Sequence, residues 1–192
     1  MPAMMSRILV CLLMLALAAC DLPGTTPQVT VLGGEITVRA PQFYCVSQGA
    51  SRSSADTAVV VIGRCAENGL VSAALVTVTI GRFASGGVML AGAEKLRDFL
   101  RSAAGRKAMS RSGRAGDVAV LQSGVVDGTL MLHLNDRMAG DYWRAIIGLK
   151  GRLVTISASG AEGAPLTPAD GQRLVEETVA ALIRANPASP QP

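Results

Sequence analysis

The sequence contains one histidine, His133, and so offers one imidazole that could activate a serine or cysteine nucleophile, as hydrolases require. Residues 129–135 place a leucine at every second position and predict a strand, in which Leu130, Leu132 and Leu134 share one face. If these leucines face the core, His133 lies partly exposed on the opposite face, beside Met131. A hydrolase with its site around His133 is therefore the alternative function to be weighed.

Motifs of other chemical centres are lacking. A Gly-x-Ser-x-Gly nucleophile elbow does not occur, because the stretch Ser157 to Gly160 lacks the first glycine. One histidine and widely spaced cysteines do not form a zinc ligand set. The glycine-rich stretches lack the lysine and hydroxyl pattern of a phosphate loop. The sequence therefore predicts no catalytic residue, no metal and no cofactor, and a protein that is not an enzyme.

The N-terminus has the layout of a signal peptide. A short segment carrying Arg7 precedes a run without charge from residue 8 to residue 19. A membrane-spanning helix needs about 20 apolar residues, so this shorter run fits a signal peptide better. We expect a signal peptide helix that is removed after export.

The end of this run resembles the lipobox of bacterial lipoproteins, because Leu17, Ala18 and Ala19 precede Cys20. The resemblance is to small lipoproteins of the proteobacterial type. It implies cleavage between Ala19 and Cys20, acylation of Cys20, and a domain held at the cell envelope facing the periplasm. Asp21 resembles the signal that retains some lipoproteins in the inner membrane, so that membrane is slightly favoured over the outer one. An ordinary signal peptide with an incidental cysteine is the alternative.

Two of the four cysteines remain after these assignments. Cys11 leaves with the signal peptide and Cys20 takes lipid, which leaves Cys45 and Cys65 as a pair in an oxidising compartment. We predict a disulfide between them, with two buried thiols as the alternative.

The chain divides into four segments. We expect a lipoprotein signal peptide at residues 1–19, a flexible tether at 20–28, one α+β domain at 29–186 and a disordered tail at 187–192. The tail carries three prolines and no apolar cluster.

Strands dominate the predicted domain. Apolar alternation and runs of β-branched residues predict strands at residues 35–39, 58–62, 73–80, 117–122, 129–135, 142–149 and 152–159. Asp127-Gly128 and Lys150-Gly151 predict two-residue hairpin turns between the last four strands. Val154, Ile156 and Ala158 are expected to face the core.

Helices are expected in two places. Apolar residues recur at helical spacing between residues 92 and 110, where Gly105 suggests a break into two short helices. A terminal helix is expected to start with Thr167 as its cap and Pro168 in its first position, and to end at Asn186.

The predicted fold class is α+β, a mainly antiparallel β-sheet packed against two or three helices, besides the cleaved signal peptide helix. The order of elements, with the stretch from Tyr142 to Thr155 before a closing helix, resembles the Mog1/PsbP-like architecture. That resemblance implies a binding or assembly module.

Charge limits the partners. The net charge of +4 is small, and export argues further against nucleic acid. Seven basic residues fall between Lys95 and Arg114, which indicates either a solvated helix face or a patch for anionic lipid or polymer. We therefore expect a membrane-anchored periplasmic lipoprotein that binds or assembles an envelope protein or polymer.

Overall fold

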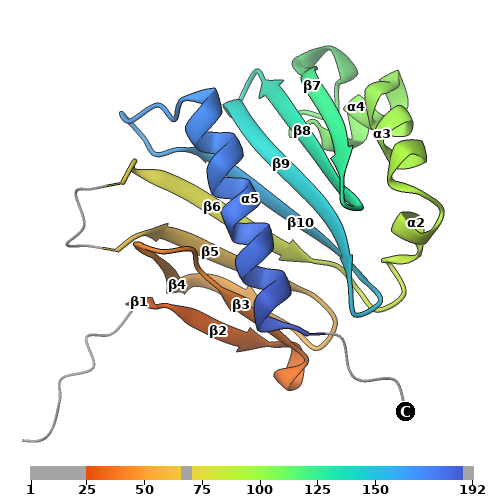
Figure 1. The fold of residues 1–192 in the computed structure, drawn as a ribbon. Coiled ribbons are helices and arrows are strands. Elements are labelled where there is room, and N and C mark those ends of the chain that lie inside the picture. The colour runs from red at the N-terminus through yellow and green to blue at the C-terminus, as the bar shows by residue number, and fades with distance from the viewer. Residues whose placement is uncertain (1–24, 66–70, 188–192) are drawn as a thin grey trace, which may run out of the picture.

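The computed structural model describes residues 25–65 and 71–187, which form an antiparallel sheet of eight strands with helices on both faces (Figure 1). Along the sheet the strands run in the order β1 (Thr25–Thr26), β4 (Tyr44–Ser53), β5 (Ala58–Arg64), β6 (Ala74–Ile80), β10 (Arg152–Gly160), β9 (Gly140–Leu149), β8 (Thr129–Asp136) and β7 (Val118–Val126). A second sheet pairs β2 (Gln28–Val31) with β3 (Ile36–Arg39).

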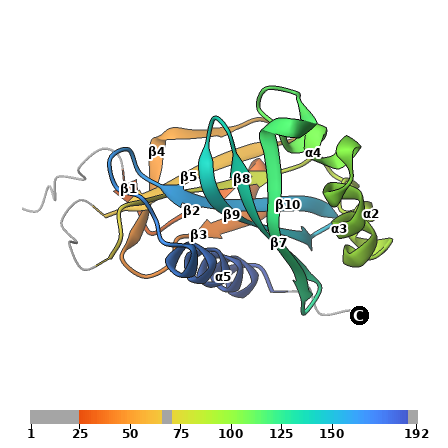
Figure 2. The ribbon, with the colours of Figure 1, turned by 90° about the horizontal axis from the view of Figure 1, so that it is seen from above.

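Four α-helices occur in these residues: α2 (Gly87–Leu90), α3 (Ala93–Arg101), α4 (Ala103–Met109) and α5 (Pro168–Ala185). Seen from above, α5 lies on one side of the sheet and α2, α3 and α4 gather at the other end (Figure 2). The predicted α+β class is confirmed, and the one-turn helix α2 makes four described helices where two or three were expected. The signal peptide and its cleavage site lie outside the described residues.

The sheet has a core on each face. On one face, α5 contributes Leu174, Val175 and Leu182 to a core that includes Val154, Ile156 and Ala158, as expected for these strand residues. On the other face, a smaller core joins Ala93 and Leu100 of α3 to strands β7, β8 and β9. Because α2, α3 and α4 reach only this end of the sheet, that face remains open over β5, β6 and β10, where residues such as Val59 and Leu75 are exposed.

Both predicted hairpin turns are confirmed. Asp127 and Gly128 have φ values of 48° and 72°, and Lys150 and Gly151 have φ values of 47° and 74°. Positive φ at both central residues is the conformation of the type I′ turn, which matches the twist of antiparallel strands. These two turns make β7 and β8 antiparallel neighbours in the sheet, and likewise β9 and β10.

Helix α5 begins and ends as predicted. The Thr167 hydroxyl accepts a hydrogen bond from the Asp170 amide (3.1 Å), and Pro168 occupies the first turn. At the other end, the Asn186 side chain accepts from the Thr37 amide (2.9 Å) and donates to the Thr37 carbonyl (2.7 Å). Asn186 therefore pairs with β3 as a neighbouring strand would, and it holds the end of α5 against the second sheet.

Two predicted boundaries were wrong. The two short helices exist, but the break falls at Ser102, whose hydroxyl caps α4 by accepting from the Gly105 amide (3.2 Å). Gly105 lies inside α4, at a position that requires glycine because a Cβ there would meet the backbone of Phe99 and Leu100. The tether was also drawn too long. Thr25 and Thr26 pair with β4, and Gln28 pairs with β3, because their backbones find strand partners.

The predicted disulfide is confirmed. Cys45 in β4 is bonded to Cys65, directly after β5, with Cα atoms 5.1 Å apart. The bond joins the ends of two paired strands, since Cys45 lies opposite Gly63 in the ladder. In the part of the chain that the structure describes, no helix is long and apolar enough to cross a membrane.

A buried ion pair links the two sheets. The guanidinium of Arg152, which is 5% exposed, donates to both carboxylate oxygens of Glu35 (3.0 and 2.8 Å). Its remaining terminal nitrogen donates to the carbonyls of Asp56 (2.7 Å) and Gly81 (3.0 Å). Lys150 adds a hydrogen bond to the Glu35 carbonyl (2.7 Å). One side chain thus holds four segments together.

Removal of the disulfide by a Cys45→Ser, Cys65→Ser double variant should lower the free energy of unfolding by about 3 kcal/mol, because the closed loop no longer limits the unfolded chain. Urea unfolding of oxidised wild type, reduced wild type and the variant measures this. Reduced wild type should match the variant, and a difference below about 1 kcal/mol between oxidised and reduced wild type would contradict the prediction.

The pKa of Glu35 lies below its ordinary value of 4.5, chiefly because Arg152 donates hydrogen bonds to the carboxylate. Because the pKa is lower in the folded state, the ionised Glu35 carboxylate contributes its full stabilisation above pH 4.5. This stabilisation is lost as pH falls through the folded-state pKa. Glu35→Gln should lower the free energy of unfolding by about 1–2 kcal/mol at neutral pH, a value reduced by the partial exposure of Glu35. Wild type and variant should converge below pH 4.5, whereas the exposed Glu94→Gln control should follow wild type throughout.

Candidate functional site

Hydroxyl groups line the open face of the sheet where β6 and β10 pair. Thr155 lies opposite Thr79, and Ser157 lies opposite Thr77. Each of these four side chains points away from the α5 core, because the alternate residues of both strands are fully buried in it. The pairing therefore places a double row of hydroxyls on a partly exposed surface.

Two arginines lie beside this row. Arg144 in β9 faces Ser157 across the ladder, and its Nε donates to the Ser157 hydroxyl (3.0 Å). Its guanidinium carbon lies 5.2 Å from the centre of the Tyr142 ring. Arg111, which follows α4, also lines the site. Together these residues enclose a cavity of about 330 Å³, lined by Leu75, Thr77, Thr79, Met109, Arg111, Ala139, Tyr142, Arg144, Thr155, Ser157 and Ser159.

The charge of this cavity is positive. Its lining includes two arginines and neither an aspartate nor a glutamate. The pKa of Tyr142 is raised, mainly by burial. Arg144 lowers it, Asp136 raises it further, and Arg111 has a smaller lowering effect. The phenol therefore stays protonated and can donate a hydrogen bond. Guanidinium groups and hydroxyl donors together suit an oxyanion, such as phosphate or carboxylate.

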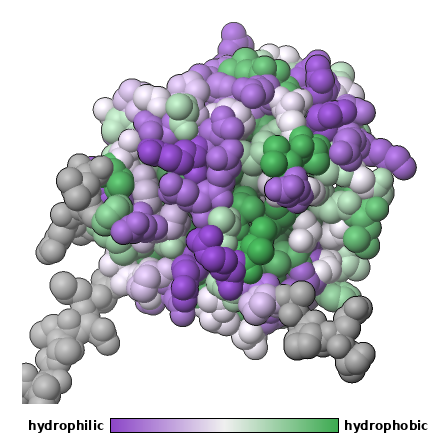
Figure 3. All heavy atoms as spheres, in the orientation of Figure 1, coloured by the Kyte–Doolittle hydropathy of each residue, from purple (hydrophilic) through white to green (hydrophobic). Residues whose placement is uncertain are grey.

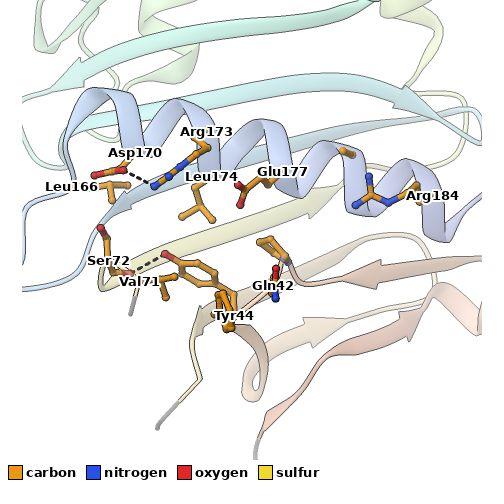
Figure 4. A pocket seen from close by; sticks show the side chains of 13 residues that line it. Gln42, Tyr44, Val71, Ser72, Leu166, Asp170, Arg173, Leu174, Glu177 and Arg184 are labelled. Atoms are coloured by element: carbon orange, nitrogen blue, oxygen red, sulfur yellow. Dashed lines mark hydrogen bonds and ion pairs between the residues drawn. The ribbon is translucent and has the colours of Figure 1, made fainter. Parts of the chain in front are cut away.

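A larger cavity of about 650 Å³ lies between α5 and the start of β4 (Figure 4). Asp170, Arg173, Glu177 and Arg184 line it along α5, while Tyr44 lines it from the strand side. Asp170 and Arg173 form an ion pair of 2.6 Å.

Some polar groups of this larger cavity already have partners, as in the Asp170–Arg173 ion pair. The Tyr44 hydroxyl donates to the Ser72 carbonyl (2.8 Å), and burial raises the pKa of Tyr44, which keeps the phenol protonated. Two acidic and two basic side chains balance in charge. The smaller cavity carries uncompensated positive charge, so it is the better candidate for a specific ligand.

His133 is partly exposed and lies on the face opposite the leucines of β8, as the sequence suggested. It occupies the α5 side of the sheet and stacks on Trp143, with ring centres 4.9 Å apart. Its Nε2 and the Trp143 Nε1 are buried without hydrogen-bond partners. The space beside them is about 10 Å³, close to the size of one water molecule. Within the described ranges, no hydrogen bond joins His133 to a serine, threonine or cysteine.

Other predicted residues have different outcomes. Ala19 and Cys20 lie outside the described residues. The basic segment from Lys95 to Arg114 supplies Arg111 to the cavity, whereas Arg144 and the hydroxyl row were missed. The hydroxyl row could have been found from β10, where Thr155 and Ser157 alternate with the residues predicted to face the core. Among the described residues, no group of three His, Cys, Asp or Glu side chains could hold a metal ion.

Comparisons with known proteins find similar solved structures but no matching family. No family model matches the chain, and no curated protein matches it. Two solved structures are similar in fold: a point mutant of Mog1, and the Ran-binding protein Mog1p of Saccharomyces cerevisiae. Each is 16% identical with a TM-score of 0.43, and the match covers 84% of this chain and 94% or 93% of the other.

Proposed function

We propose that this protein is a lipid-anchored envelope protein that binds an anionic ligand in the cavity formed by β6, β9 and β10. The observation that carries the proposal is the lining of that cavity, which combines Arg111 and Arg144 with a row of hydroxyl donors and contains no carboxylate. Each guanidinium can donate several hydrogen bonds to an oxyanion. A binding role agrees with the function expected from the sequence.

Arg144 is held in place for this role. Its Nε is occupied by Ser157, and its guanidinium lies against the Tyr142 ring. No ion pair within the described ranges engages Arg144 or Arg111. A positioned guanidinium loses little conformational freedom when it binds, which favours affinity.

The proposed location is the periplasmic side of the cell envelope, with the inner membrane slightly favoured. The support is the signal layout, the lipobox-like stretch that ends at Cys20, and the disulfide, because disulfides persist in oxidising compartments. Described structure begins at Thr25, so a lipid on Cys20 would keep the domain within a few residues of the membrane surface.

Replacement of Cys20 tests the anchor. Wild type expressed in a Gram-negative host should gain acyl mass on Cys20 and sediment with membranes, because two or three acyl chains hold a protein on a bilayer. Cys20→Ser should appear in the soluble periplasmic fraction. Intact mass and fractionation measure this, with Cys11→Ser as the matched control. An unacylated wild type would contradict the proposal.

Loss of either arginine tests the cavity. The full chain carrying Cys20→Ser, with its disulfide formed, should bind an anionic probe in calorimetric titrations with inorganic phosphate or glycerol phosphate. Arg144→Gln and Arg111→Gln should each weaken that binding about tenfold, because a charge-assisted hydrogen bond contributes about 1.5–3 kcal/mol.

The source of the anion is distinguished by vesicles. Binding to phosphatidylglycerol vesicles but not to the soluble phosphates identifies a lipid headgroup, and the reverse identifies a soluble ligand. Phosphatidylcholine vesicles are the neutral control. Arg184→Gln, which removes the same charge from the opposite face, should leave affinity unchanged. Equal weakening by Arg184→Gln, or no binding to any anionic probe, would refute the proposal.

A further inference from the structure

The eight-stranded sheet ends in two different edges. At one edge, β1 is a two-residue strand that covers β4 at Val46 and Ser47. At the other, β7 is nine residues long and pairs only with β8 among the described residues. Its outer edge therefore presents backbone groups to solvent, as the template for a further strand does.

The hairpin turn fixes which backbone groups of β7 point outward. Val126 and Thr129 flank the two-residue turn, so Val126 exchanges hydrogen bonds with β8. By alternation, Ser123 and Val125 direct their N–H and C=O groups away from β8. A bulge between Val120 and Gln122 interrupts the register, and the regular edge therefore runs from Gln122 to Val126.

A basic groove follows the same strand on the side of α3 and α4. It has a volume of about 430 Å³ and is lined by Arg101, Arg106, Ala115, Gly116, Val118, Ala119 and Val120. No carboxylate lines it. Arg106 also donates a hydrogen bond to the Arg101 carbonyl (2.5 Å). The nearby Asp117 is already paired with Arg114 (2.9 Å). The groove is thus complementary to negative charge.

The opposite side of the strand is apolar. Val126 shares the face of Gly124, which lies opposite Met131 in the α5 core, and Val126 is 62% exposed. Leu121, at the bulge, is 52% exposed. In Figure 3 apolar surface lies beside the hydrophilic band that follows α5, over the strands next to the helix. Exposed apolar residues beside an open edge are typical of interaction sites.

We infer that the outer edge of β7 binds an extended, acidic segment of a partner protein by strand addition. The segment pairs with the backbone of Gln122 to Val126 and continues past the bulge along the groove. Side chains of an added strand alternate between the two faces, so its acidic residues lie toward Arg101 and Arg106 and its apolar residues lie beside Val126. The expected partner sequence alternates acidic and apolar residues.

The test uses the full chain carrying Cys20→Ser and labelled ten-residue peptides, with fluorescence anisotropy as the readout. A peptide of alternating Val and Glu should bind, and a peptide of alternating Val and Lys should not. Arg101→Glu with Arg106→Glu should weaken binding at least about tenfold. The matched control, Lys95→Glu with Lys107→Glu, makes the same charge change on the same two helices outside the groove and should leave binding unchanged.

A proline variant tests the backbone pairing. Ser123→Pro removes an outward N–H without breaking the ladder to β8, and edge strands tolerate proline there. It should weaken binding about tenfold at a thermal midpoint close to that of wild type. Equal loss from the lysine control pair would overturn the inference in favour of diffuse electrostatic attraction, and unchanged binding by the arginine pair would also overturn it. If no peptide binds, and wild type dimerises whereas Ser123→Pro does not, the inference is overturned in favour of a second copy of this chain as the added strand.

Discussion

The arrangement of the two sheets depends on the hydrogen bonds that the buried Arg152 guanidinium donates. The guanidinium binds Glu35 at the start of β3, the Asp56 carbonyl in the turn after β4, and the Gly81 carbonyl at the end of β6. A buried guanidinium must have its donors satisfied, and these acceptors come from segments far apart in sequence. The second sheet is thereby held against the main sheet at the end where the β9–β10 hairpin turns.

The hydrogen bonds of Arg152 help to determine which face of the eight-stranded sheet remains open. With the second sheet and α5 closed over one face, and with Asn186 holding α5 to Thr37, that face is filled by the larger core. The opposite face is covered at the end of β7, β8 and β9, and by α2 where β9 turns into β10. Hydroxyl and guanidinium groups therefore remain accessible over β6, β9 and β10. The cavity over β6, β9 and β10 exists because the two faces of the sheet are covered to different extents, and no single sequence motif produces it.

Local signals made part of this structure predictable. The turns at Asp127 and Lys150 and the caps of α5 depend on neighbouring residues, so the sequence displays them directly. Strand β4 was missed because its second half, Ser47–Ser53, carries no apolar alternation and is held by pairing with β5. The face of His133 was predicted correctly from the leucines of β8, but its stacking on Trp143 was not, because that contact depends on the register of β8 and β9. The cavity was missed because Arg144 meets Ser157 only through the register of β9 and β10.

Asn186 has a consequence for how copies of the molecule could associate. Its amide occupies the backbone groups of Thr37 on β3, while β4 is bulged beyond the residues that β1 covers. Among these edges, the regular stretch of β7 from Gln122 to Val126 then remains open to an added strand. Open-ended growth of a filament requires two complementary edges on each subunit, whereas a molecule with one such edge is saturated by a single added strand. Assembly through this sheet is therefore self-terminating.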